Sequence, residues 1–149
     1  MEIAILLFKL YESLLSPDFL PENAIEKLGP VTKKTTHRWE LAPKNKDYST
    51  TFLLFENLPA GNNLMTTIEI TFKDPFVIPL TNLESVFGKK DRWHPPMNIG
   101  APNVLQFYTK QGKPLKGVVL FRVEKKGLKN NKKEDLIISS VLLRRIFSK

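Results

Sequence analysis

Residues 80–93, LTNLESVFGKKDRW, repeat the order of features found in residues 20–39, LPENAIEKLGPVTKKTTHRW. Each stretch has apolar residues at helical spacing, then a glycine and a pair of lysines, and it closes on Arg-Trp. Glycine adopts the positive φ angles at which many helices end. Both stretches therefore predict a short helix that ends at a glycine and leads into extended chain.

The later of these helices carries a start signal. Thr81 and Glu84 have the spacing of a capping box, in which each side chain accepts a hydrogen bond from the other residue's backbone N–H. Leu83 and Phe87 then share an apolar face, and Gly88 follows as the end signal. The sequence thus predicts a helix that begins at Thr81.

The earlier helix is marked at both ends. Pro21 suits the first helical turn, where its missing N–H has no partner to lose. Ala24 and Leu28 share one face, and Gly29 ends the pattern. Helices of about two turns are unstable alone, so each must pack on an apolar surface.

Three strands are expected after each helix. In residues 66–72, Ile68, Ile70 and Phe72 alternate with polar residues, which is typical of a half-buried strand. The last apolar run is apolar on both faces, so its register stays open. The expected strands are residues 37–41, 49–56 and 66–72, and then residues 103–109, 117–124 and 136–147.

A further amphipathic helix is expected at the N-terminus, ending near residues 16–17. It is too short to span a membrane, and no signal-peptide pattern surrounds it. A cytoplasmic protein is expected, or a periplasmic one if a leader has been removed. The predicted buried stripe consists of Ile3, Leu6, Leu7, Leu10 and Leu14.

These elements predict a single α+β domain over residues 1–149. An N-terminal helix would precede two α-β-β-β halves, at about residues 18–79 and 80–149. Short connections favour antiparallel neighbours, and the layer rule places the helices on one face of the sheet. One six-stranded sheet and two half-sheets side by side both satisfy this pattern.

The charge of the chain is unevenly distributed. Residues 1–79 contain 8 basic and 10 acidic residues, whereas residues 80–149 contain 15 and 5, so the net charges are −2 and +10. Such asymmetry favours an acidic partner, namely nucleic acid, an anionic membrane or an acidic protein, although solubility alone would also account for it. The chain has no cysteine, which removes disulfides and thiolate chemistry.

Elements of an active site are missing from the sequence. His37 and His94 are the only histidines, and no zinc-binding spacing, nucleophile motif or glycine-rich phosphate loop occurs. We therefore expect no catalytic residues, no metal and no cofactor, and a protein that is not an enzyme.

Basic residues of the second half are expected at two ends of the sheet, because antiparallel strands reverse at each connection. Lys110, Lys113 and Lys116 would lie with Arg144 and Arg145 at one end. The lysines of residues 125–133 would lie at the other end. Nucleic-acid binders instead line one groove with cations, so nucleic acid remains the alternative to a protein partner.

Aromatic residues beside arginines suggest contact sites. Trp39 leads into a strand and is expected to pack against the sheet. Residues 89–102 form a proline-rich connection that is not expected to be regular structure, and such loops are often functional. The candidate contact residues in and near it are Lys89, Lys90, Arg92, Trp93 and His94, together with Tyr108 and Arg122, which are expected to share the outward face of the sheet.

The two helix segments LTNLESVFGK and PENAIEKLGP, each opening a run of strands, give the chain a resemblance to the bacterial inhibitor fold typified by beta-lactamase inhibitory protein. That group includes some toxin immunity proteins. The match covers about a fifth of the chain, and the cysteines and lipobox of some members are absent here. The resemblance implies a protein that binds and blocks another protein through its sheet face. Together with the basic second half, it leads us to expect an acidic protein partner, such as a toxin or effector.

Overall fold

The chain begins with a helix that precedes two similar series of elements. The computed structural model describes residues 2–57, 62–88, 92–94, 103–108, 115–124 and 135–147. In this part of the chain, α1 (Glu2–Leu14) is followed by α2 (Pro21–Leu28) and four strands, and then by α3 (Leu80–Phe87) and four more strands. The strands are β1 (Val31–Lys34), β2 (Arg38–Leu41), β3 (Tyr48–Asn57), β4 (Asn63–Pro79), β5 (Arg92–His94), β6 (Asn103–Tyr108), β7 (Lys116–Val123) and β8 (Asp135–Ile146).

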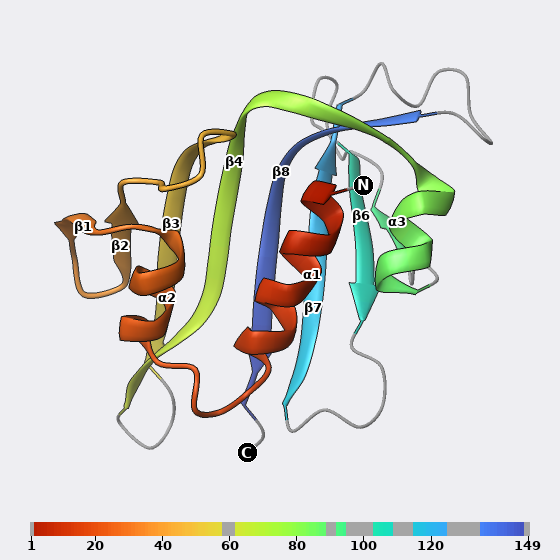
Figure 1. The fold of residues 1–149 in the computed structure, drawn as a ribbon. Helices are drawn as coiled ribbons and strands as arrows, with labels where there is room; N and C mark the ends of the chain where they lie inside the picture. Colours follow the sequence, from red (N-terminus) through yellow and green to blue (C-terminus); the bar gives the residue numbers. More distant parts are fainter. Residues whose placement is uncertain are drawn as a thin grey trace.

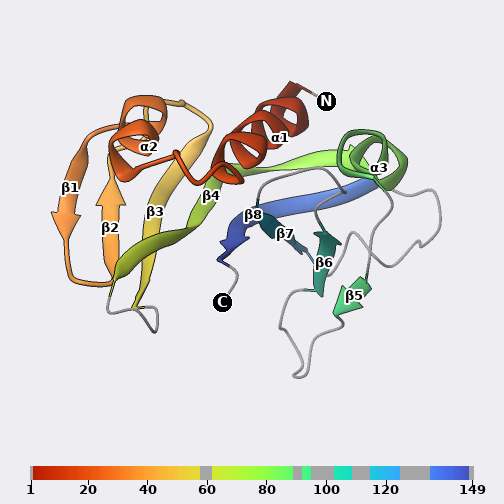
Figure 2. The same ribbon diagram turned by 90° about the horizontal axis from the view of Figure 1, so that it is seen from below.

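All of these strands form one antiparallel sheet in the order β1-β2-β3-β4-β8-β7-β6-β5. The two series meet where β4 pairs with β8, and the first strand of each series lies at an edge. The three helices lie on the same face of the sheet (Figures 1 and 2). The predicted α+β class, with an antiparallel sheet and helices on one face, is confirmed.

The two edge strands are a correction to the sequence analysis. Three strands were expected per half, yet β1 precedes the first set and β5 precedes the second. The expectation that residues 89–102 contain no regular structure is wrong for residues 92–94. Each edge strand is only three or four residues long and has one pairing partner, so neither needs the apolar alternation that identifies a strand from sequence.

The helix starts also differ from the prediction. α3 begins at Leu80 with Pro79 as its N-cap, and no side-chain cap bond forms, so the capping box expected at Thr81 is absent. α2 begins at Pro21 as predicted, and the Leu20 N–H donates to Asn23 Oδ1 at 2.8 Å. The prediction that α2 and α3 end at a glycine is confirmed, since Gly29 and Gly88 follow these helices with φ angles of 134° and 92°.

The register of β8 is decided by the neighbours on both of its sides. Leu143 pairs with Ile68 on β4 and with Val119 on β7, and Val119 pairs with Phe107 on β6. All four side chains in this row are buried on the side of the helices. A strand that is apolar on both faces thus takes the register that puts its odd-numbered residues from 141 to 145 in the core.

α1 packs over the centre of the sheet (Figure 1). The predicted stripe is correct for Leu7, Leu10 and Leu14 but wrong for Leu6, which is 49% exposed. Ala4 and Tyr11 are buried instead. The apolar stripe of α1 is wider than the surface that contacts the sheet. Packing against the sheet therefore decides which part of the stripe is buried.

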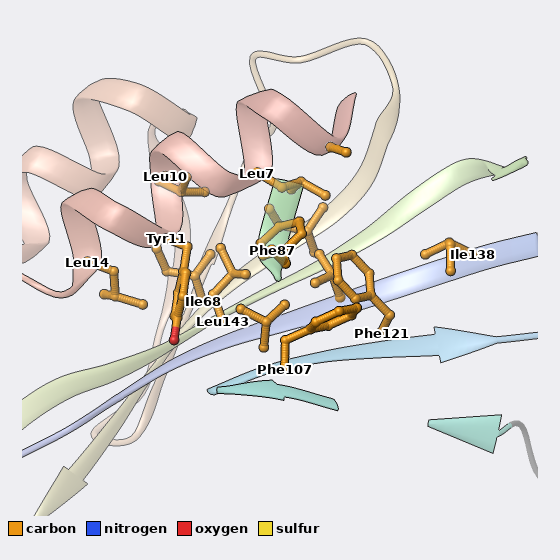
Figure 3. Close-up of a cluster of buried hydrophobic side chains, with 14 of the residues drawn as sticks. Leu7, Leu10, Tyr11, Leu14, Ile68, Phe87, Phe107, Phe121, Ile138 and Leu143 are labelled. Carbon is orange, nitrogen blue, oxygen red and sulfur yellow. The ribbon is translucent and has the colours of Figure 1, made fainter. Parts of the chain in front are cut away.

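An aromatic cluster joins α1, α3 and the second series of strands (Figure 3). The Phe87 ring lies 5.3 Å from Phe121 and 5.6 Å from Phe107, measured between ring centroids. Phe8 and Tyr11 reach the same ring from α1, at 5.3 and 6.4 Å. Edge-on and tilted pairs of this kind add to the burial of apolar area, so Phe87 connects the three elements.

Candidate functional site

The side of the sheet opposite the helices is called the open face, because no helix of the described chain covers it (Figure 2). Its residues alternate along each strand with the buried residues of the core. One cross-strand row on this face passes through β2, β3, β4, β8, β7 and β6. Its members are Glu40, Phe52, Glu69, Leu142, Leu120 and Gln106.

A shallow hollow of about 80 Å³ lies in the part of the open face formed by β4, β8, β7 and β6. Leu120 and Leu142 provide apolar surface, and Val104 extends it on β6. Arg122 and Glu69 are the charged residues that line it. The hollow places half-buried aliphatic side chains beside one exposed arginine, and arginine is a residue type enriched at protein-binding hot spots.

Arg144, also on this face, is paired inside the protein. Its guanidinium lies 2.8 Å from Glu56 Oε1, and both side chains are about 40% exposed. The pair spans from β8 to β3 across β4, since Arg144 is in register with Thr67 on the intervening strand. Arg144 therefore links the two series and is less available to a partner than Arg122.

In the first series of strands, another arginine of the open face, Arg38, lies over an aromatic ring. The Arg38 guanidinium carbon lies 4.6 Å from the centroid of the Phe52 ring. Glu40 and Glu69 flank Phe52 in the cross-strand row. This part of the open face thus carries cations and carboxylates side by side.

Arg145 is a correction to the predicted contact surface, because it is buried, with 3% of its surface exposed. It follows Arg144 in the strand, so its side chain points to the helix face. Its Nε donates to Met65 O at 3.0 Å, and one terminal nitrogen donates to Leu14 O and Ser16 O at 3.2 and 2.9 Å. Burial lowers the pKa of Arg145. The guanidinium satisfies carbonyls at the end of α1 and fastens that helix to the sheet.

Several of the residues predicted to contact a partner are either outside the described part of the chain or described only in their backbone. Lys89, Lys90, Lys110 and Lys113 are outside the described residues. For Arg92, Trp93, His94 and Tyr108 only the backbone is described. Trp93 pairs with Leu105, which is buried in the core. Tyr108 pairs with Val118, so its position in the register is on the same face of the sheet as that of Arg122.

The predicted grouping of Lys116 with the end of β8 is confirmed, since Lys116 pairs with Ile146. Trp39 packs against the sheet as expected, with its ring 4.7 Å from Phe55. The Lys34 ammonium lies 4.1 Å from the centroid of the same indole. These contacts give Trp39 a structural role.

The two histidines are not brought together. His37 precedes β2, near one edge of the sheet, and His94 ends β5 at the other edge. Within the described ranges, no three His, Cys, Asp or Glu side chains are grouped as metal ligands would be. The same part of the chain contains no helix that could cross a membrane.

Four residues of the open face were not predicted from the sequence: the apolar Phe52, Leu120 and Leu142, and the neighbouring Glu69. The signal was present in the alternation of β7, where Leu120 and Arg122 fall between Val119, Phe121 and Val123. It could not be used for β8, because apolar residues occupy both faces of that strand.

Comparison with known proteins adds no relative. No family model matches the chain, and neither a curated protein nor a solved structure matches it significantly.

Proposed function

We propose that the protein is a non-enzymatic inhibitor that binds an acidic protein partner through the open face of its sheet. The observation that carries this proposal is the exposed arginine beside apolar residues in the hollow of β4, β8, β7 and β6. The net charge of +10 on residues 80–149 would steer an acidic partner toward this half. Inhibition would follow from occlusion of the partner's own site.

An immunity-type role, in which the partner is a bacterial toxin or effector, is the more specific form of this proposal. It rests on the resemblance of the two helix segments to the bacterial inhibitor fold. The three helices lie on one face of the sheet, and the open face is not covered by a helix of the described chain, which is compatible with such a role (Figure 2).

Nucleic acid is the alternative partner, favoured by the charge of the second half alone. The described open face argues for protein, because Glu40, Glu56 and Glu69 stand among its arginines. Carboxylates would repel a phosphate backbone, whereas a protein partner can match charges of both signs.

A charge-reversal pair tests the proposal. The tagged protein would capture its partner from an extract of its own cells, and the partner's affinity would then be measured for wild type, Arg122→Glu and Lys46→Glu. Lys46 is exposed in the connection before β3, so it receives the same change of charge away from the hollow. We expect Arg122→Glu to weaken binding by at least about tenfold and Lys46→Glu to have little effect.

Equal affinity of wild type and Arg122→Glu, with both variants folded, would remove the open face from the proposal. A gel-shift assay on generic DNA and RNA at two salt concentrations separates the alternative. Binding that falls steeply with salt and ignores sequence would assign the protein to nucleic acid instead.

A further inference from the structure

A separate groove lies on the helix face, between α1 and α2 and over the start of β3. Its volume is about 260 Å³. In Figure 1, α2 lies over the first series of strands, and α1 lies beside it over the centre of the sheet. The groove is on the opposite side of the sheet from the open face, so it is not part of the site proposed above.

The floor of the groove is apolar. Leu10 from α1, Leu28 from α2 and Tyr48 from β3 are each more than nine-tenths buried, and all three line the groove. Leu6 lines it as well, yet 49% of this leucine is exposed. An alkyl chain in the groove would cover Leu6 and remove this apolar surface from water.

The rim is positively charged. Lys9 on α1 and Lys27 on α2 both line the groove and are exposed. Neither ammonium has an ion-pair partner among the residues that the structure describes. Two unpaired cations beside an apolar floor are complementary to a ligand that is apolar at one end and anionic at the other.

Tyr48 adds a hydrogen-bond donor. Only 6% of the residue is exposed, and within the described chain its hydroxyl has no hydrogen-bond partner. Burial, and then the neighbouring Asp47 carboxylate, raise the pKa of Tyr48, so the phenol keeps its proton well above neutral pH. Although most of the residue is buried, the hydroxyl oxygen itself is reached by solvent, and such a donor is suited to a bound oxyanion.

The volume limits the size of the ligand. Drug-sized ligands occupy pockets of roughly 300–1,000 Å³, so this groove takes something smaller. A ligand of about ten non-hydrogen atoms, such as an eight-carbon carboxylate, is in that smaller range.

We propose that the groove between α1 and α2 binds a medium-chain alkyl carboxylate. The alkyl chain lies on Leu6, Leu10 and Leu28, and the carboxylate meets Lys9 and Lys27 and accepts a hydrogen bond from Tyr48. Two charge-assisted contacts and one phenol donor then select a carboxylate over an alcohol or an amine of equal length.

Calorimetric titration with octanoate, octanol and octylamine, all below their micelle-forming concentrations, tests this inference on the full-length protein. We expect octanoate alone to bind measurably. The double variant Lys9→Gln/Lys27→Gln should weaken octanoate binding by roughly tenfold or more, and Tyr48→Phe by roughly threefold to tenfold. The matched control, Lys33→Gln/Lys46→Gln, removes the same charge from exposed lysines that do not line the groove and should bind like wild type.

Equal binding of octanol and octanoate would overturn the proposal, as would octanoate binding that survives loss of both rim lysines. Absence of octanoate binding would also overturn it. Concentration-dependent self-association that the Lys9→Gln/Lys27→Gln variant abolishes would show that a second copy of the chain occupies the groove. Because Arg122 lies on the other face, none of these results affects the proposed inhibitor function.

Discussion

Two neighbouring arginines show how differently the two faces of the sheet treat a charge. Arg144 points to the open face, where it pairs with Glu56 and stays about 40% exposed. Arg145 points to the helix face, where it is buried and donates to three backbone carbonyls. A charge on the open face can rely on water, whereas a charge on the helix face must have its donors satisfied by the protein.

This difference separates stability from binding. The helix face holds the aromatic cluster and the leucines of α1, so changes there should mainly alter the free energy of unfolding. The open face holds half-exposed side chains, so changes there should mainly alter affinity for a partner. Four predicted effects of substitutions on the two faces test this difference.

The largest effect is expected from Phe87→Ala. The ring contacts aromatic side chains from α1, β6 and β7, so its loss leaves a cavity where three elements meet. We expect a loss of about 3–5 kcal/mol in the free energy of unfolding, measured by urea denaturation. Leu120→Ala on the open face is the control and should cost only about 1 kcal/mol; a similar cost for both would contradict the comparison.

Arg145→Ala is expected to rank second. The substitution leaves the carbonyls of Met65, Leu14 and Ser16 without the hydrogen bonds that Arg145 donates. We therefore expect a loss of about 3 kcal/mol in the free energy of unfolding. Arg145→Lys supplies a cation without the planar fork and should recover only part of that loss. Full recovery by lysine would show that charge alone, and not the hydrogen-bond geometry, holds α1.

Arg144→Ala tests the same chemistry on the open face. Its single ion pair with Glu56 is partly exposed, so removing it should cost only about 0.2–1 kcal/mol. The cost should shrink further in high salt, which screens exposed pairs. A loss as large as that of Arg145→Ala would mean that the open face is also a structural interface.

The smallest effect at neutral pH is expected from Tyr48→Phe. The pKa of Tyr48 is raised in the folded protein above its ordinary value of 10.0, so its contribution is fully present below pH 10. That contribution is lost as pH rises from 10 through the folded-state pKa. Thermal unfolding at pH 9 to 11 should therefore show a steeper loss for wild type than for Tyr48→Phe. Parallel curves would indicate that this phenol is not desolvated.

Local signals in the sequence predicted the elements that they control. Gly29 and Gly88 end helices because their backbone angles are unfavourable for other residues, and this needs no tertiary information. The alternation of Ile68, Ile70 and Phe72 likewise predicts its buried face. The two edge strands could not be predicted this way, because short strands with one partner carry no such alternation.

The candidate site was predicted only in part. Arg122 lies on the open face, and the register position of Tyr108 is on the same face, as expected from the alternation along the strands. Arg145 was assigned to the surface by its charge, although its neighbours in space bury it. The groove on the helix face has no sequence signal, since its residues come from α1, α2 and β3 and meet only when both helices dock.

The α+β class, the C-terminal ends of the helices and the faces of the strands with clear alternation follow from the sequence alone, because they depend on backbone preferences and on periodicity along the chain. The register of β8, the rotation of α1 and the burial of Arg145 are fixed only by packing in three dimensions. Each of these has alternatives that are equally apolar or equally charged in the sequence. The choice between them is made by packing and by the need of buried carbonyls and guanidinium donors for partners.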